Sequence, residues 1–263
     1  FNSFLENIDP YKRYMYQSDI DILSKYTYEI DDAFNQPNLE FFNLAHEILI
    51  KRIDEGKQIS QEVLSKPFDF QIEETFNFDI DELQYVNSRT DLVERWRKLM
   101  KVYLIENYHD EIKEDERTFK KDSTYEFRSY SEIEIETRET LNETMADYFI
   151  IMEEEFQRQH WFSIYLNSFV SQFDPNTSYL DPEDRDRFNI DMSGNYAGIG
   201  AVLRKKVDKI EITELISGGP AWRNNSLEKG DVILKVRQEN DGEPVSIVGY
   251  RLADAVKLIK GEK

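Results

Sequence analysis

The residues best suited to chemistry in this sequence are glycines that open a predicted strand. Residues 193–203 read SGNYAGIGAVL, so Gly198 and Gly200 bracket a single apolar residue. Such a pattern can turn consecutive backbone N–H groups toward one point and form a nest for an anion such as a peptide carboxylate. Hydrogen bonds to a charged oxygen are among the stronger ones in proteins. The same glycines are also typical of an ordinary β-turn, and this segment alone does not decide between the two.

The other clusters of reactive residues do not complete a catalytic or metal site. His46 begins a pattern like that of zinc proteases, but Ile50 stands where the second histidine is required. Residues 174–178 offer the first oxygens of a calcium loop, but Tyr179 and Arg185 replace its glycine and glutamate. The sequence contains no Gly-x-Ser-x-Gly elbow and no phosphate-binding loop. We therefore predict no catalytic residue, no metal and no cofactor in this chain.

The amino-acid composition excludes some classes of binding partner. The 263 residues include 53 acidic and 33 basic ones, a formal net charge of −20. Such a surface repels phosphate backbones and anionic lipid, so we expect no nucleic-acid partner. No apolar run reaches the ~18–20 residues of a membrane-spanning helix, and the absence of cysteine excludes disulfides and a cysteine nucleophile. The chain opens on Phe1 without a leader pattern, so we expect a processed or truncated piece.

Glycine and charge divide the sequence into two parts. Nine of the ten glycines fall in residues 191–263, where basic and acidic residues nearly balance. The remainder is acidic, poor in glycine and rich in apolar residues spaced three and four apart, as in helices. We predict an α+β protein with an all-helical domain at residues 1–188 and a small β-rich domain at 189–263.

The elements that must position the glycine segment follow from local patterns. Residues 113–138 are densely charged, and we expect a loop or solvated hairpin there, with a short strand at 131–136 where Ile133 and Ile135 alternate. Leu252, Ala255, Val256 and Ile259 share one face of a predicted helix that Gly261 ends. The remaining predicted helices lie at 18–30, 39–53, 91–113, 141–156 and 162–173, and the predicted strands at 199–203, 210–215 and 232–236.

A second motif supports the carboxylate nest. Residues 217–222 (SGGPAW) give a Pro-Ala helix start, and residues 227–236 follow as Leu-x-x-Gly-Asp-x-Ile-Leu-x-Val. This order resembles PDZ domains, at the same distance from their carboxylate-binding loop. The resemblance implies a free strand edge beside a helix, with the last apolar side chain of a bound peptide between them. The predicted peptide-binding residues are Tyr196, Ala197, Gly198, Ile199, Gly200, Ala201, Val202, Leu252, Val256 and Ile259. Ala201 is small for this position and indicates a roomy pocket.

Motifs at both ends of the chain point to one family. They lie at residues 8–10, 17–20, 31–33, 173–180, 192–194, 198–203, 218–222 and 248–252. Together these segments resemble the tail-specific proteases, also called carboxy-terminal processing peptidases. Asn176 stands where this family often has histidine, which leaves any role of that imidazole in doubt here.

The family implies a bacterial enzyme exported to the periplasm, which captures apolar C-terminal tails of protein substrates in its PDZ domain. Its protease domain, with a serine nucleophile activated by a lysine base, follows the PDZ domain, so we expect it beyond Lys263. We also expect the PDZ-like domain to lack its last strand and to be less stable than the helical part.

Two other functions stay open at this stage. The chain could be a non-enzymatic periplasmic adaptor or scaffold protein whose acidic helices dock a partner. It could also be a helical oligomerisation platform, if Trp96, Trp161 and many of the tyrosines and phenylalanines form an exposed patch rather than the core.

Overall fold

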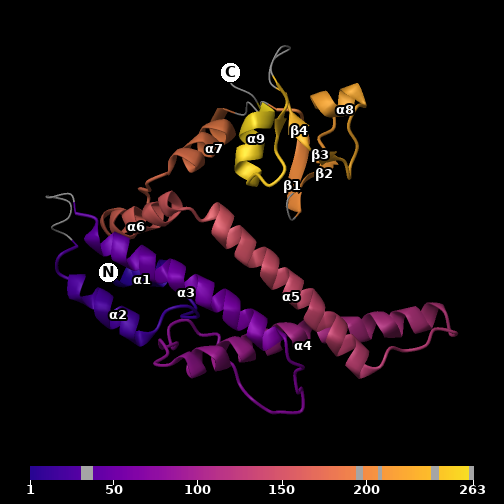
Figure 1. Ribbon diagram of the computed structural model, residues 1–263, viewed down its shortest axis with the longest axis horizontal. Coiled ribbons are helices and arrows are strands. Elements are labelled where there is room, and N and C mark those ends of the chain that lie inside the picture. The colour runs from indigo at the N-terminus through magenta and orange to yellow at the C-terminus, as the bar shows by residue number, and fades with distance from the viewer. Residues whose placement is uncertain (31–37, 194–197, 207–208, 238–242, 261–263) are drawn as a thin grey trace. The chain divides into compact units, whose positions relative to one another are not determined.

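The chain forms two compact units, Phe1–Tyr179 and Leu180–Lys263. In the computed structural model, residues 1–30, 38–193, 198–206, 209–237 and 243–260 are described. The first unit is helical and the second holds the strands (Figure 1), which confirms the predicted fold class. The predicted domain boundary at residue 188 falls inside a helix of the second unit and stays a prediction.

In the part of the first unit that the structure describes, six α-helices are present. The longest pair, α4 and α5, is joined by a short connection, and both helices pack against α3. The bounds are α1 Asn2–Ile8, α2 Gln17–Leu23, α3 Glu40–Leu64, α4 Arg89–Lys121, α5 Tyr130–Glu155 and α6 Arg158–Phe173, with a 3₁₀ turn at Ser24–Tyr26. The helix expected over residues 18–30 is therefore shorter than predicted. It begins at Gln17 because the Asp19 carboxylate accepts the N–H of Tyr16.

The core of this unit is aromatic. Phe42 of α3, Trp96 of α4 and Phe149 of α5 are fully buried, and the Trp96 indole donates to the carbonyl of Arg13 at 2.8 Å. Trp161 is buried as well. Both tryptophans lie in the core, so neither contributes to an exposed oligomerisation patch.

The prediction for residues 113–138 is also wrong. Helix α4 continues to Lys121, and α5 begins at Tyr130 after a capping box in which Ser129 and Glu132 bond each other's backbone N–H. Residues 131–136 are helical, and Ile133 is buried whereas Ile135 is exposed. Thr137 and Leu141 are also buried and follow Ile133 at intervals of four residues. This spacing is that of one helix face, so the apolar residues at 133 and 135 did not indicate a strand.

The second unit places a helix beside a small sheet. Strand β1 (Ala201–Lys206) pairs antiparallel with β2 (Lys209–Leu215), which pairs with β3 (Val232–Ile233). Strand β2 and helix α9 (Leu252–Lys260) agree with the prediction, whereas β1 begins and ends later than the predicted strand at 199–203. The single strand predicted over 232–236 is divided into β3 and β4 (Lys235–Val236), which belong to different sheets. Gly261, the expected stop, lies outside the described residues. The remaining elements are α7 Pro182–Ser193, α8 Pro220–Asn224 and β5 Val245–Ser246.

Fully buried Ile210, Ile247 and Ala255 form the centre of the second core. They come from β2, the segment after β5 and α9, so this core fixes the helix against the strands. Among the described helices, none has both the length and the apolar character needed to cross a lipid bilayer.

Candidate functional site

A groove of about 320 Å³ lies between the start of β1 and α9. One wall comes from the glycine segment and β1, and the other from the last two turns of α9. The lining residues are Gly198, Ile199, Gly200, Ala201, Leu203, Ile216, Gly219, Pro220, Val256, Ile259 and Lys260.

The glycine loop is held in place by its carbonyl groups. The carbonyl of Ile199 accepts the N–H of Ala221 at 2.8 Å, and the carbonyl of Gly200 accepts the N–H of Ile216 at 2.9 Å. A trans peptide unit points its N–H away from its C=O, so the N–H of Gly200 is directed away from Ala221. Within the described part of the chain, the N–H groups of residues 198–200 donate no hydrogen bond. These donors are thus available to a ligand.

Glycine is required in this loop for two physical reasons. Gly200 has φ +74°, a left-handed conformation that side chains disfavour. A Cβ on Gly200 would also lie 3.0 Å from the Cα of Gly219 and 3.1 Å from the Cδ of Pro220. The start of β1 therefore packs directly on the backbone that leads into α8.

Strand β1 presents an unpaired edge to the groove. Among the described strands it pairs with β2 alone. The bond from Ile216 N–H to Gly200 C=O flanks the Ala201–Leu215 pair, which makes this a non-hydrogen-bonded pair. The N–H and C=O of Ala201 consequently point away from β2. An extended peptide can pair with such an edge.

Helix α9 supplies the apolar wall. Ala255 is fully buried and faces the core, which turns Val256 and Ile259 toward the groove. Lys260 lies at the end of the same wall, where its Cγ is 3.8 Å from the position a Cβ would take on Gly198. A lysine therefore stands beside the three available N–H donors.

Most of the described residues predicted for peptide binding line this groove. Two do not: the side chain of Val202 lies on the exposed face of β1, and Leu252 packs against the small core. Tyr196 and Ala197 lie outside the described residues. The prediction missed Leu203, Ile216, Gly219, Pro220 and Lys260.

The alternation of β1 could have identified Leu203, because Ala201 and Leu203 share one face of the strand. No local pattern points to Ile216, which reaches the groove through strand pairing. In the described part of the chain, no group of three His, Asp or Glu side chains is placed to hold a metal ion.

Known proteins match both units. The family model described as the tail specific protease N-terminal domain matches residues 1–183, and the PDZ domain model matches residues 187–263. A tail-specific protease from Haemophilus influenzae is 29% identical over 264 residues, covering 100% of this chain and 35% of that protein. A probable CtpA-like serine protease from Staphylococcus haemolyticus is 37% identical over 90 residues, which are 34% of this chain and 17% of that protein.

A solved structure is also similar in sequence. The PDZ domain of a carboxy-terminal protease from Vibrio cholerae, in complex with peptide, is 45% identical over 26% of this chain and 67% of its own, with a TM-score of 0.24. The chain spans about a third of the length of its Haemophilus relative. Since the N-terminal model alone matches well over half of the residues, the chain belongs to the tail-specific protease family, of which it holds the N-terminal domain and the PDZ domain.

Proposed function

We propose that this chain is the substrate-recognition part of a periplasmic tail-specific serine endopeptidase. In this proposal the groove between β1 and α9 captures the C-termini of substrate proteins, and a Ser/Lys protease domain outside this chain cuts them. The observation that carries the proposal is the set of N–H donors at residues 198–200, which have no partner among the described residues and stand beside an apolar groove.

Each part of a peptide tail has a matching group in the groove. The terminal carboxylate accepts the N–H groups of Gly198, Ile199 and Gly200, and the charge of Lys260 adds attraction. The peptide backbone pairs with the free edge of β1 at Ala201. The last side chain enters between Ile199 and the α9 wall. Because Ala201 is small, side chains of different sizes fit.

The expected affinity is moderate. Burial of one apolar side chain contributes about 1.5–3 kcal/mol, and the carboxylate bonds and strand pairing add to it. A micromolar complex corresponds to about −8 kcal/mol. A protease gains little from tighter binding, because uniform stabilisation of the bound substrate does not accelerate cleavage.

A calorimetric titration tests carboxylate capture. The ligand is a decapeptide that ends in small apolar residues, and the control is the same peptide with an amidated C-terminus. We expect micromolar binding of the free acid and at least tenfold weaker binding of the amide. Equal binding of the two peptides would show that the groove does not recognise the carboxylate.

A matched pair of valine variants tests the location of the site. Val256 lines the groove, whereas Val202 points to solvent from the opposite face of β1. We expect Val256→Asp to abolish peptide binding, because it places a carboxylate in the apolar wall. Val202→Asp should leave the dissociation constant within twofold of the original. If both variants bind alike, the peptide occupies another surface.

Proteolysis and location are tested on the full-length protein. The names of the Haemophilus and Staphylococcus relatives support a protease, and the family resemblance supports the periplasm. We expect the full-length protein to fractionate with periplasmic contents and to degrade an unstructured substrate faster when its C-terminus is free than when it is amidated. Cytoplasmic fractionation would overturn the location alone.

A further inference from the structure

A second cavity, of about 220 Å³, lies in the helical unit and combines cationic with aromatic lining. It opens between the segment after α1, the connection between α3 and α4, and helix α4. The residues used below are Tyr11, Arg13, Phe76, Phe78, Arg95 and Tyr103.

Arg13 stands among aromatic rings, and the carboxylate of Asp9 acts on its charge without a direct ion pair among the described contacts. Its guanidinium carbon lies 5.2 Å from the centroid of the Tyr14 ring, 5.3 Å from that of Tyr148 and 5.7 Å from that of Tyr11. It donates one hydrogen bond to the hydroxyl of Tyr148. Among the described residues it forms no ion pair. The other four of its five N–H donors form no hydrogen bond with a described residue.

Arg95 likewise has no ion pair with a described residue. It donates to two backbone carbonyls, those of Lys12 and Gln84, and the bond to Gln84 is 2.6 Å long. Burial lowers the pKa of Arg95, and the charges of Asp9 and Asp91 offset this only in part. The guanidinium is thus desolvated without a direct counter-ion.

The buried carboxylate of Asp9 is not a direct counter-ion of Arg95. Its oxygens accept the backbone N–H groups of Arg13, Tyr14 and Met15 at 2.9, 3.1 and 2.9 Å. These bonds shape the turn after α1 and leave Asp9 without an ion pair to either arginine of the cavity among the described contacts.

Several other arginines of the helical unit pair directly with carboxylates, whereas Arg158 bonds the side-chain oxygen of Asn43. Arg52 bonds Asp19 at 2.8 Å, and Arg138 bonds Glu134 at 2.9 Å. In a chain with 53 acidic and 33 basic residues, carboxylates are in excess. Two arginines that meet at one cavity without an ion pair are therefore a distinctive feature.

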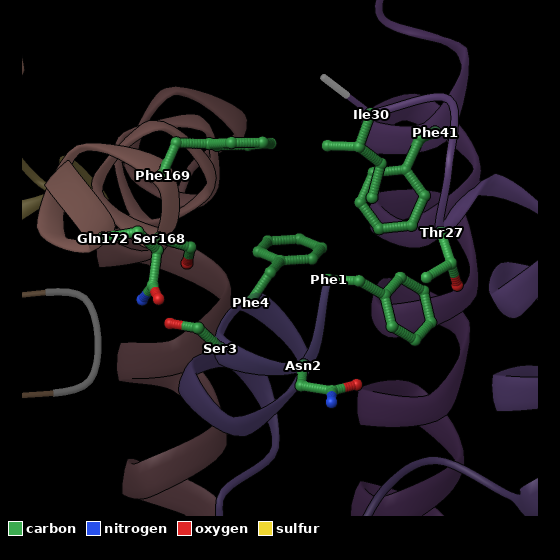
Figure 2. Close-up of a pocket in the computed structure, with 10 residues that line it drawn as sticks. All are labelled: Phe1, Asn2, Ser3, Phe4, Thr27, Ile30, Phe41, Ser168, Phe169 and Gln172. Atoms are coloured by element: carbon green, nitrogen blue, oxygen red, sulfur yellow. The ribbon is translucent and has the colours of Figure 1, made fainter. Parts of the chain in front are cut away.

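A different cavity of the same unit lacks this feature. About 360 Å³ is enclosed at the chain start by α1, α6 and the beginning of α3, and the ten side chains that line it include no Asp, Glu, Lys, Arg or His (Figure 2). Phe1, Phe4 and Phe41 face this space. None of its side chains carries a charge with which to select an anion.

We propose that the cavity of Arg13 and Arg95 binds a polypeptide segment in which a carboxylate adjoins an aromatic side chain. Guanidinium groups recognise carboxylates through paired N–H donors, and the rings of Tyr11, Phe76 and Phe78 form walls for the aromatic group. The volume lies below the ~300–1,000 Å³ typical of small-molecule sites, so it suits one side chain and its neighbour. This site is independent of the groove beside α9.

The carboxylate can come from an acidic side chain or from a chain terminus, and the experiment separates these sources. The whole chain is titrated calorimetrically with acetyl-alanyl-glutamyl-phenylalanyl-alanine amide and with its glutamine counterpart. The amidated end keeps the probe from using a terminal carboxylate. A third peptide, acetyl-trialanyl-phenylalanine with a free C-terminus, is titrated into the Val256→Asp variant, whose α9 groove is blocked.

Phe78 offers a variant with a matched control. Its exposed fraction is 55%, and that of Phe127, which lies outside the cavity, is 54%. We expect Phe78→Asp and Arg95→Gln to weaken binding at least tenfold, and Phe127→Asp to change it less than twofold. Unchanged unfolding temperatures verify that the variants fold.

Each outcome decides the proposal. Tighter binding of the glutamyl peptide than of its glutamine counterpart, lost in Phe78→Asp, supports a side-chain carboxylate. Binding of the free-acid peptide alone, also lost in Phe78→Asp, supports a terminal one. The proposal is overturned if the affinity does not depend on the charge of the peptide, or if Phe78→Asp leaves the affinity unchanged. It is also overturned if no peptide binds.

Discussion

Gly200 and Gly218 share a backbone conformation but not an environment. Their φ angles are +74° and +80°, so a side chain at either position is strained by about 1–2 kcal/mol. A Cβ on Gly218 would meet nothing within 4 Å, whereas one on Gly200 would press on Gly219 and Pro220. Alanine substitutions at these two positions therefore distinguish the effect of backbone strain from the effect of close packing.

We expect Gly200→Ala to weaken peptide binding at least tenfold, because the added methyl group must displace the loop that carries the N–H donors. Gly218→Ala should lower the free energy of unfolding by about 1–2 kcal/mol but leave peptide affinity nearly unchanged. Peptide titration and urea unfolding of both variants check this. Equal losses of affinity would mean that strain alone governs the loop.

Lys260 provides a test of electrostatics in the same groove. We expect Lys260→Glu to raise the dissociation constant of a free-acid peptide by about fivefold, because the side chain lines the groove beside Gly198. The effect should shrink at high salt. Lys229→Glu changes the net charge equally outside the groove and serves as control; a similar loss there would point to a long-range effect.

The backbone of the groove was predicted from the sequence more accurately than the side chains that line it. The glycines at 198 and 200 have a local signature, and the helical spacing of Val256 and Ile259 places both on one face. The side chain of Val202, one of the predicted peptide-binding residues, does not line the groove, because a strand exposes only alternate residues to one side. Ile216 was missed because its position depends on pairing with Gly200, which no local pattern encodes.

Charges on α4 hold the connection between α3 and α4. The carboxylate of Glu74 pairs with Lys101 at 2.6 Å and with Arg97, and Lys101 also donates to the carbonyl of Ile72 at 2.9 Å. Lys101 is buried. Hydrogen bonds from Arg97 and Lys101 lower the pKa of Glu74 to about 2. The connection is thus tied to the helix by charge as well as by apolar contact.

We expect Glu74→Gln to lower the free energy of unfolding by about 3 kcal/mol, because it leaves the Lys101 ammonium buried without its carboxylate. A carboxyl whose pKa falls on folding stabilises the protein above its unfolded pKa near 4.5. This stabilisation is lost between about pH 4.5 and pH 2 in the original chain and is absent in the variant. Glu62→Gln breaks an exposed pair with Arg89 and should change stability little; equal effects would contradict a special role for Glu74.

The long hairpin of α4 and α5 shows where sequence patterns fail. Residues 113–138 have many charges and few apolar residues, which resembles a loop. In the structure those charges pair within the hairpin: Arg128 bonds the buried carboxylate of Asp115 and also Glu111 and Glu136. Because these partners come from both helices, the pattern becomes interpretable only after the helices are paired.

The two units have cores of very different size. In the described residues, the helical unit buries many large side chains, including Trp96, Phe42 and Phe149. Among the described residues of the second unit, the fully buried apolar side chains are the smaller set Ile210, Ile212, Ile247 and Ala255. Since buried apolar area provides most of the stability of a domain, we expect the second unit to open more readily than the first.

Hydrogen exchange with and without a peptide tail tests this at the level of the whole chain. Amides near Ile212 should exchange faster than those near Leu99 in the free protein. A free-acid peptide at a hundred times its dissociation constant stabilises the unit that binds it by about 2.7 kcal/mol. Amides near Ile212 should then slow by about a hundredfold, while those near Leu99 stay unchanged. Equal slowing in both units would show that they open together, and the separate cores would then not behave as separate cooperative units.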